Sequence, residues 1–532
     1  MRRSVGLVTA IVVAVAVSAG AGASTSVAQE ADPATGPEDL TDALAAIEGK
    51  PRYDQSDWGY SVIDAQSGEV VAAQNEQKMF DPGSTMKLYA VSTALRLYDP
   101  DYQFHTPVYR QGDVTGGVLD GNLVLVASGD LSFGLREQPD GTLYYENTPD
   151  LDHSYANVGL AGAVEPPGNP LTGLDELAAA ARGAGITRVN GDVVIDDRLF
   201  AQYDGFPDGL ISPIWVNENL IDVQVIPGDV GQTATIDWRP VTATYTVENQ
   251  VQTVDKDTKN PAQLQVTEPI PGHLVVTGDI VAGGTPALVV KEVDDPSAFA
   301  RTAFIEALQR AGVTVTATPT GTNPASLLPP KDSYQPTDML GEHVSATLAQ
   351  YANLILKVSY NRGADLMTCL AAVMEGSTDC EQGLVAELDA ITDAGVSKTG
   401  VYPQDGAGSD DQGRSTPAAM ATFLKEVASD SYGEVLADSL PVLGKSGTLA
   451  DVLSKSPAAG HAQVKTGNRA TGTPAGQVLL LGNSLAGYVD TKSGRRVVFM
   501  IAVDNVPLAA APGIFKVTID QARMVGAIYR LL

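Results

Sequence analysis

The chain has 532 residues, 44% of them hydrophobic, and its 34 Lys and Arg stand against 64 Asp and Glu, which gives a net charge of −30 at pH 7. One hydrophobic core usually serves roughly 250 to 300 residues, so we expect two or three domains. Binding along a nucleic-acid backbone needs a basic surface, and the acidic balance excludes that class of partner. We interpret the acidity as serving solubility.

The first 28 residues have the three parts of a secretory signal peptide: two arginines at the start, an apolar core over 5–17, and small residues at 26–28 for cleavage. A membrane-spanning helix needs about 20 apolar residues, more than this core or any later stretch offers. We therefore predict an exported chain without a transmembrane anchor, located in the cell wall or another extracytoplasmic space. Residues 29–44, rich in Ala, Pro, Gly and Glu, indicate a linker.

Cys369 and Cys380 lie 380 − 369 = 11 residues apart. In an exported chain this spacing favours a local disulfide, and two free thiols are the alternative that stays open. The five histidines have no metal-ligand spacing such as H-E-x-x-H. We therefore predict no metal and no cofactor, and we interpret each histidine as structural.

In chain order, the stretch 60–87 alternates apolar and polar residues around Ser67-Gly68, which predicts a β-hairpin followed by a loop. Apolar residues then recur at helical spacing after Pro82-Gly83, so Ser84 is predicted to open a helix. From about 106 to 335, short β-like runs lie between Gly, Pro and Asp turns, interrupted by predicted helices at 174–185 and 297–312.

From about 340 the pattern predicts helices again, at 343–358 and 364–375, and a further one at 449–455. Two apolar strand-like runs follow, at 476–490 and 495–505. A helix from residue 517 to the C-terminus closes the chain. We find no internal repeat of fixed period.

Ser84 and Lys87 lie three residues apart at a predicted helix start, which places both side chains on one face. The lysine amine can there take the hydroxyl proton, and the helix N-terminus favours negative charge developing on the oxygen. No other serine in the chain is followed by lysine three positions later. The alternative interpretation is a helix cap beside a solvated lysine.

Ser359 and Asn361 form the only Ser-x-Asn in the chain and lie between two predicted helices. A hydroxyl at this place could relay a proton, and an amide could hold a substrate carbonyl through hydrogen bonds. A helix-capping turn is the alternative interpretation.

Lys-Thr-Gly occurs at 398–400 and at 465–467, and a near-copy, Lys-Ser-Gly, occurs at 445–447. A triplet that works with Ser84 must present its lysine, its hydroxyl and a bare glycine backbone along a strand edge. The triplet at 465 follows an apolar run and precedes two predicted strands. The triplet at 398 follows a helix end, and the near-copy leads into a predicted helix, so we assign the site to Lys465-Thr466-Gly467.

The order and context of these three motifs resemble the active-site set of penicillin-recognising serine acyltransferases. The nearest group is the D-alanyl-D-alanine carboxypeptidase/endopeptidase family, the low-molecular-mass class C penicillin-binding proteins. The gap between the first two motifs, 359 − 84 = 275 residues, is too long for a simple β-lactamase and is similar to that of this family, which inserts domains there. The resemblance runs from about residue 55 to the C-terminus and includes "LVLVASGDLSFG", "VNENLIDVQVIPG" and "DGAGSD".

The resemblance implies a mixed α/β fold class. A transpeptidase/β-lactamase-like catalytic domain, an antiparallel sheet flanked by helices, would be assembled from residues 45–105 and 336–532. Residues 106–335 would form inserted β-rich domains, which we expect to be two, with the inner one at about 224–290.

The resemblance also implies the acylation machinery. Ser84 would attack the carbonyl between two D-alanines, Lys87 would act as its base, and Ser359 would help to pass the proton to the leaving amine. Backbone N–H groups of Ser84 and of the residue after Gly467 would form the oxyanion hole, where each donor is generally worth about 3 to 4 kcal/mol.

Substrate binding would use Asn361 for an amide of the acyl chain, Lys465 for positive potential, and Thr466 to line the subsite. Family members usually carry Thr or Ser after the Lys-Thr-Gly, whereas this chain has Asn468. Its amide can still donate to the terminal carboxylate of a substrate. The segment 468–483 is also longer than is usual in the family.

The function implied is that of an exported serine hydrolase that acts on peptidoglycan stem peptides through an acyl-enzyme, as a D-Ala-D-Ala carboxypeptidase, an endopeptidase or both. β-Lactams would be covalent inhibitors. One alternative is a β-lactamase or esterase on the same fold, which fast deacylation would reveal. The other is a non-catalytic cell-wall-binding protein, which need not keep Ser84, Lys87, Ser359 and Lys465 together.

Overall fold

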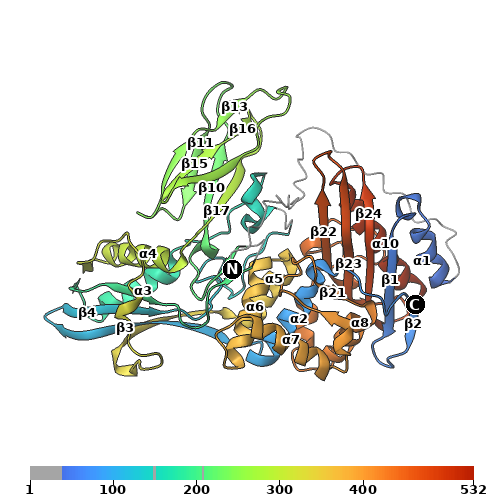
Figure 1. Ribbon diagram of the computed structural model, residues 1–532, viewed down its shortest axis with the longest axis horizontal. Coiled ribbons are helices and arrows are strands. Elements are labelled where there is room, and N and C mark those ends of the chain that lie inside the picture. Colours follow the sequence, from blue (N-terminus) through green and yellow to red (C-terminus); the bar gives the residue numbers. More distant parts are fainter. Residues whose placement is uncertain (1–38, 148–150, 206–208) are drawn as a thin grey trace, which may run out of the picture. The chain divides into compact units, whose positions relative to one another are not determined.

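The computed structural model describes residues 39–147, 151–205 and 209–532, which divide into two compact units. The first unit combines the described residues up to Tyr89 with Leu388–Leu532, and the second unit runs from Ala90 to Glu387 (Figure 1). The predicted signal peptide and most of the predicted linker lie outside the described residues. The boundaries given above for the catalytic and inserted domains stay a prediction.

A five-stranded antiparallel sheet forms the centre of the first unit, in the order β2-β1-β24-β23-β22 (Figure 1). Its strands are β1 (Asp57–Asp64), β2 (Val70–Gln74), β22 (Ala462–Gly472), β23 (Val478–Asp490) and β24 (Arg496–Leu508). The predicted hairpin and the two predicted C-terminal strands are therefore confirmed. β1 pairs with β24 from Asp57–Asp504 to Asp64–Val497, so two strands far apart in the sequence lie side by side in one sheet.

Successive side chains of each strand point to opposite faces of this sheet, and helices cover both faces. On one face, Phe499 and Val489 belong to a buried cluster that includes α1 (Leu40–Glu48) and α10 (Gly513–Leu531). On the other face, the hydroxyl of Tyr488 donates to Leu424 O of α8 (Pro417–Val427) at 2.9 Å. The predicted fold class, an antiparallel sheet flanked by helices, is confirmed, as is the predicted C-terminal helix.

The remaining elements of the first unit are short. They are η1 (Pro51–Tyr53), η2 (Gly83–Met86), the start of α2 (Lys87–Tyr98), η8 (Lys398–Gly400), β20 (Val401–Tyr402), β21 (Arg414–Ser415), α9 (Gly433–Ser439) and η9 (Gly447–Leu449). The helix predicted at 449–455 is wrong, since residues 450–459 form turns. Leu453 has a φ of 50°, which no right-handed helix accepts.

A mixed six-stranded sheet forms one part of the second unit, in the order β18-β6-β4-β3-β19 with β7 beside β4. Its strands are β3 (Gln103–Thr115), β4 (Val118–Val126), β6 (Arg188–Val189), β7 (Val193–Asp196), β18 (Thr314–Val315) and β19 (Met339–Thr347). Two helices, α3 (Thr172–Gly183) and α4 (Pro296–Arg310), share its buried cluster through Leu174, Leu177 and Phe304. Both helices were predicted.

Smaller sheets complete the β-rich part of the second unit, in the orders β11-β10-β17-β5, β12-β15-β14, β13-β16 and β8-β9. Their strands are β5 (Leu160–Ala161), β8 (Tyr203–Asp204), β9 (Leu210–Ile211), β10 (Leu220–Ile226), β11 (Thr235–Arg239), β12 (Thr246–Asn249), β13 (Gln252–Val254), β14 (Gln265–Ile270), β15 (His273–Thr277), β16 (Asp279–Val281) and β17 (Ala287–Glu292). The unit also contains four short 3₁₀ helices among its described residues: η4 (His153–Val158) before β5, η5 (Asn217–Asn219) before β10, and η6 (Ala325–Leu327) and η7 (Pro336–Asp338) between β18 and β19.

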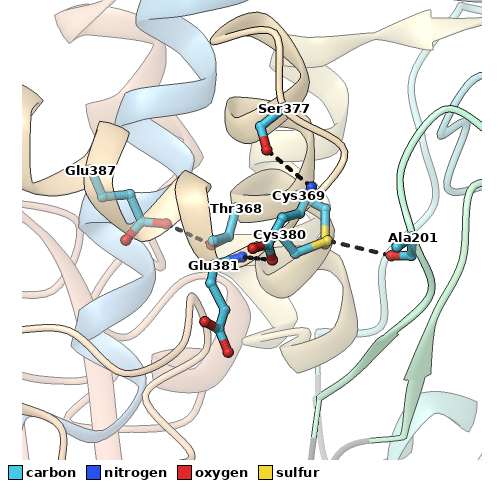
Figure 2. The surroundings of a disulfide bond; sticks show 8 residues. Ala201, Thr368, Cys369, Ser377, Cys380, Glu381 and Glu387 are labelled. Carbon is cyan, nitrogen blue, oxygen red and sulfur yellow. Dashed lines mark hydrogen bonds between the residues drawn. A yellow bond between two sulfur atoms is a disulfide. The ribbon is translucent and has the colours of Figure 1, made fainter.

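Three helices follow β19: α5 (Leu348–Val358), α6 (Asn361–Met374) and α7 (Glu381–Asp393), the last of which crosses the boundary between the units. The helix predicted from residue 343 begins only at Leu348, because His343 and Val344 pair with β3. Cys369 and Cys380 form a disulfide that joins α6 to the residue before α7 (Figure 2). The disulfide favoured by the sequence is therefore present. Beside it, Thr368 Oγ1 donates to Glu387 Oε1 at 2.5 Å.

Candidate active site

The nucleophile candidate Ser84 lies in the turn η2, at the entrance to α2. Its Oγ is 2.7 Å from Nζ of Lys87, which is fully buried. Gly83 just before it has a φ of 47°, and a Cβ there would lie 2.7 Å from Asn468 N. The turn that carries Ser84 therefore packs directly against β22.

A second contact fixes the Lys87 amine. Nζ also donates to Ala407 O at 2.8 Å, in the loop that follows β20. The buried carboxylate of Asp405 holds this loop by accepting from the backbone N–H groups of Ser409 and Asp410, at 2.8 and 2.6 Å. The amine of Lys87 is thus aimed at Ser84 by a main-chain oxygen that is itself held in place.

Lys465 and Thr466 lie on β22, the edge strand of the sheet, as predicted for this triplet. Lys465 is fully buried, and its Nζ donates to Thr466 O at 2.7 Å. Burial lowers the pKa of Lys465 well below its ordinary value, and the positive charge of Lys87 adds to the shift. Thr466 Oγ1 donates to Thr448 Oγ1 at 3.0 Å.

Gly467 occupies a place that no side chain could share. A Cβ on it would lie 2.2 Å from Pro82 O, 2.7 Å from Ser484 Oγ and 2.9 Å from Ser84 N. Ser484, which is paired with Gly467 in the sheet, donates to Pro82 O at 2.6 Å. The bare backbone of Gly467 is what lets β22 approach the nucleophile turn.

Asn468 follows on the same strand, is exposed, and pairs in register with Asn483. The pairing of β22 and β23 continues to Gly472 and Val478, so the long segment noted in the sequence is an extended hairpin. The first unit thus brings together Ser84, Lys87, Lys465, Thr466, Gly467 and Asn468.

Ser359 and Asn361 lie in the second unit, where α5 ends and α6 begins. Ser359 is 9% exposed, has the left-handed φ of 65°, and its carbonyl accepts a hydrogen bond from the hydroxyl of Tyr155. Asn361 is the first residue of α6. The structure therefore places this pair at a helix junction, between two helices as predicted.

Residues 40–521 match the model of the family described as D-Ala-D-Ala carboxypeptidase 3 (S13). The chain belongs to this family. The D-alanyl-D-alanine carboxypeptidase of Actinomadura sp. (strain R39) is 25% identical over 460 residues, which are 81% of this chain and 76% of that protein. The D-alanyl-D-alanine carboxypeptidase DacB of Haemophilus influenzae is 22% identical over 469 residues, 84% of this chain and 85% of that protein.

Solved structures give the same fold. The crystal structure of penicillin binding protein 4 (dacB) from Haemophilus influenzae is similar with a TM-score of 0.66 and 19% identity, and the match covers 92% of this chain and 99% of that one. A structure of that protein complexed with a novel β-lactam is similar with a TM-score of 0.64. The family and the enzyme class predicted from the motifs are thereby confirmed: the chain is a D-Ala-D-Ala carboxypeptidase, a serine hydrolase.

The two other triplets of this carboxypeptidase lie elsewhere. Lys398 is exposed on η8 and forms an ion pair with Asp389 at 3.3 Å. Lys445 is also exposed, and the carbon atoms of its side chain lie near Gly460. Among the three lysines, Lys465 alone is buried beside the Ser84 turn.

Three charged residues lie near the nucleophile turn of this carboxypeptidase and were not predicted from the sequence. Arg469 Nε donates to Asp81 Oδ2 at 2.8 Å, and Asp81 Oδ1 accepts from Gly83 N at 3.1 Å. Asp504 Oδ2 accepts from Asp81 N at 3.1 Å. Asp81 stands directly before the Pro-Gly of the turn, a capping position that could have identified it; Arg469 and Asp504 carry no comparable signal.

Within the described residues, no group of three or more His, Cys, Asp and Glu is arranged to hold a metal ion. In the same part of the chain, every helix is too short or too polar to cross a membrane.

Proposed function

We propose that this D-Ala-D-Ala carboxypeptidase is exported, cleaves peptidoglycan stem peptides through an acyl-enzyme on Ser84, and binds penicillins at the same serine. The observation that carries the proposal is the 2.7 Å contact between Lys87 Nζ and Ser84 Oγ. An amine at that distance can accept the hydroxyl proton once it is neutral. Burial, and after it the charge of Lys87, lowers the pKa of the nearby Lys465.

In the proposed acylation step, Ser84 Oγ attacks the carbonyl carbon between the two D-alanines while its proton passes to Lys87 Nζ. The backbone N–H groups of Ser84 and Asn468 stabilise the oxyanion of the tetrahedral intermediate. Support for this pair comes from the contact of Gly467 with the Ser84 turn, since it brings the strand within reach of the same carbonyl oxygen.

The C–N bond then breaks, and the leaving amine takes the proton held by Lys87, which Ser359 helps to deliver. This step releases D-Ala and leaves an ester on Ser84. Water attacks the ester, gives its proton to Lys87, and frees the shortened peptide with Ser84 restored. In this sequence Lys87 acts first as base and then as acid, so a positioned amine suffices for both half-reactions.

Asn361 and Thr466 bind the peptide backbone of the substrate in this proposal, and Lys465 and Asn468 attract its terminal carboxylate. Asn468 has an amide where a hydroxyl is usual, and an amide can donate to a free carboxylate or to the amide of a crosslink. We therefore include endopeptidase activity on crosslinked stem peptides.

Export is supported by the basic, apolar and small-residue segments of the first 28 residues. An extracytoplasmic place in or near the cell wall follows from the substrate. Inhibition by β-lactams is supported by the β-lactam complex of penicillin binding protein 4 from Haemophilus influenzae, a protein of similar fold.

The test is the intact mass of the purified mature protein after brief exposure to benzylpenicillin, followed by peptide mapping. We expect one stable adduct on the peptide that contains Ser84, its loss in Ser84→Ala, and its retention in Ser67→Ala, a serine of the β1–β2 turn. Circular dichroism verifies that both variants fold. An unlabelled protein with intact drug would overturn the proposal, and an unlabelled protein with hydrolysed drug would make the enzyme a β-lactamase.

A further inference from the structure

We propose that Tyr155 and Tyr360 are positioning residues for Ser359, and that a buried ion network in the second unit holds both of them. The network consists of Arg136, Asp152, His153, Glu218, Asp222 and Arg239. This inference rests on the proposed role of Ser359 in proton transfer. It assigns the 106–335 segment a task in the reaction, namely to hold the second catalytic motif.

The backbone of Ser359 needs an external support. Its left-handed φ of 65° is unfavourable for a residue with a Cβ by about 1 to 2 kcal/mol. The turn also leaves the Ser359 carbonyl outside the regular bonding of α5, and the Tyr155 hydroxyl donates to that oxygen. Tyr155 therefore fixes the orientation of the peptide unit that carries the Ser359 side chain.

Tyr155 belongs to the short turn η4, whose start is anchored by charge. Asp152 caps the turn by accepting from Ser154 N at 3.1 Å, and Arg136 binds the same carboxylate with two donors, at 2.7 and 2.9 Å. His153 is fully buried, with one ring nitrogen 3.0 Å from Glu218 and the other 3.0 Å from Asp222.

Glu218 is the centre of the network. It contacts Arg136 and His153, and its negative charge also acts on the nearby hydroxyl of Tyr360. Glu218 lies in a run of three left-handed residues, Asn217 to Asn219, with φ values of 53°, 52° and 54°. Such a run of left-handed residues is strained. It places the side chain of Glu218 in the interior, where Glu218 forms its ion pairs.

The network pairs its cationic side chains with carboxylates. Although burial opposes its charged form, Asp222 and Glu218 raise the pKa of His153 to about 9. Arg136 faces Asp152 and Glu218, and Arg239 Nε lies 3.1 Å from both Asp222 and Glu165.

Two arms of this network end at adjacent residues. Tyr155 donates to the carbonyl of Ser359, and the charge of Glu218 acts on the hydroxyl of Tyr360, the next residue. Arg362 Nη2 donates to the Tyr360 hydroxyl at 3.4 Å and lies over the ring of Trp215, which adds a third support. A buried ion network stabilises a fold little better than apolar packing does, so geometric specificity is its better explanation here.

The test is a double-mutant cycle on the rate constant of acylation by benzylpenicillin and on kcat for a peptide ending in D-Ala-D-Ala. We expect Tyr155→Phe to lower both rates about 3- to 10-fold, which is what one ordinary hydrogen bond is worth, with KM unchanged. Tyr334→Phe is the matched control, since it removes a hydroxyl that donates to Asp196 at 2.6 Å in the same unit. This control should keep the wild-type rates.

The double variant Tyr155→Phe/Ser359→Ala separates positioning from general loosening. If Tyr155 acts through Ser359, the double variant is as slow as Ser359→Ala alone. Losses that multiply, or a Tyr155→Phe enzyme as fast as wild type, would overturn the inference while the proposed function stands. A fully active Ser359→Ala would instead refute the role of Ser359 in the proposed function.

Glu218→Gln tests the other arm, since the amide keeps the shape of the carboxylate. We expect a loss at least as large as that of Tyr155→Phe, with the thermal midpoint measured to verify folding. Should Glu218→Gln fail to fold, Tyr360→Phe tests the same arm by deleting one hydroxyl. Wild-type rates in Tyr360→Phe would remove Tyr360 from the inference.

Discussion

Arg469 lies on β22, two residues after Gly467, and Asp81 lies three residues before Ser84. Arg469 Nε donates to Asp81 Oδ2 at 2.8 Å. The pair joins the strand that carries Lys465 to the turn that carries the nucleophile. Asp81 is 3% exposed, so loss of Arg469 would leave a buried carboxylate without this ion pair. We expect Arg469→Ala and Asp81→Asn each to slow acylation by benzylpenicillin about 10- to 100-fold, because a small displacement of a reacting group has effects of this size.

Arg495→Ala is the control for this prediction. Arg495 Nε also donates to a carboxylate of the first unit, Asp64 Oδ2 at 3.0 Å, at the far end of β1. The Arg495→Ala variant should be acylated by benzylpenicillin at the wild-type rate. Equal rates in Arg469→Ala and Arg495→Ala would show that the Arg469 pair does not position Ser84.

Gly467→Ala should abolish acylation. The added methyl would lie 2.2 Å from Pro82 O and 2.9 Å from Ser84 N, and both are backbone atoms, so either β22 or the nucleophile turn must move. Gly472→Ala on the same strand is the matched control, since its methyl would meet nothing closer than 3.7 Å. Benzylpenicillin labelling, followed by intact mass, compares the two variants; an acylated Gly467→Ala protein would contradict the prediction.

Replacing each of the three triplet lysines by alanine tests the choice among them. Lys465→Ala should lower the acylation rate constant by at least about 100-fold, the scale of a lost electrostatic donor in an active site. Lys398→Ala and Lys445→Ala should leave it unchanged, because both side chains are exposed. A loss confined to either exposed lysine would refute the assignment of the motif to Lys465.

Asp504 predicts a pH dependence of stability. Burial, aided by the charges of Asp81 and Asp57 and opposed by Arg414 and by the hydrogen bond from Asp81 N, raises the pKa of Asp504 to about 7. The folded state therefore binds this proton more tightly than the unfolded state, whose pKa is about 4. The stabilisation is complete below pH 4 and is lost as the pH rises from about 4 to about 7.

Asp504→Asn keeps a neutral side chain at every pH. Its stability advantage over wild type should grow between pH 5 and pH 8, by about 1 to 3 kcal/mol. Thermal unfolding at the two pH values measures this difference. An advantage of the same size at both pH values would mean that Asp504 does not titrate in this range.

The features best predicted from the sequence were those with a repeating residue pattern or a distinctive local motif. Alternation predicted the β1–β2 hairpin and the C-terminal strands, and the Pro-Gly turn predicted the helix after Ser84. The choice of Lys465 followed from strand context, and the edge position of β22 confirms that context. The disulfide was favoured because its two cysteines are close in sequence.

Pairs that are distant in sequence could not be predicted. Arg469 and Asp81 are 388 residues apart, and nothing in either local pattern refers to the other. The prediction of a helix at 449–455 failed because Leu453 has a left-handed φ, which helix propensity does not foresee for a leucine. His153 was interpreted as structural, and spacing rules for metal ligands give no signal for a histidine enclosed by two carboxylates.

The pairing of β1 with β24 has a consequence for biosynthesis. β1 precedes the residues between Ala90 and Glu387 in the chain, whereas its partner β24 follows them and ends at Leu508. The sheet that supports Ser84 therefore cannot close until β24 has been synthesised, whereas the residues between Ala90 and Glu387 have their own core and are complete sooner. The enzyme gains its nucleophile site after that unit, so chains truncated before β24 should be folded in part and inactive.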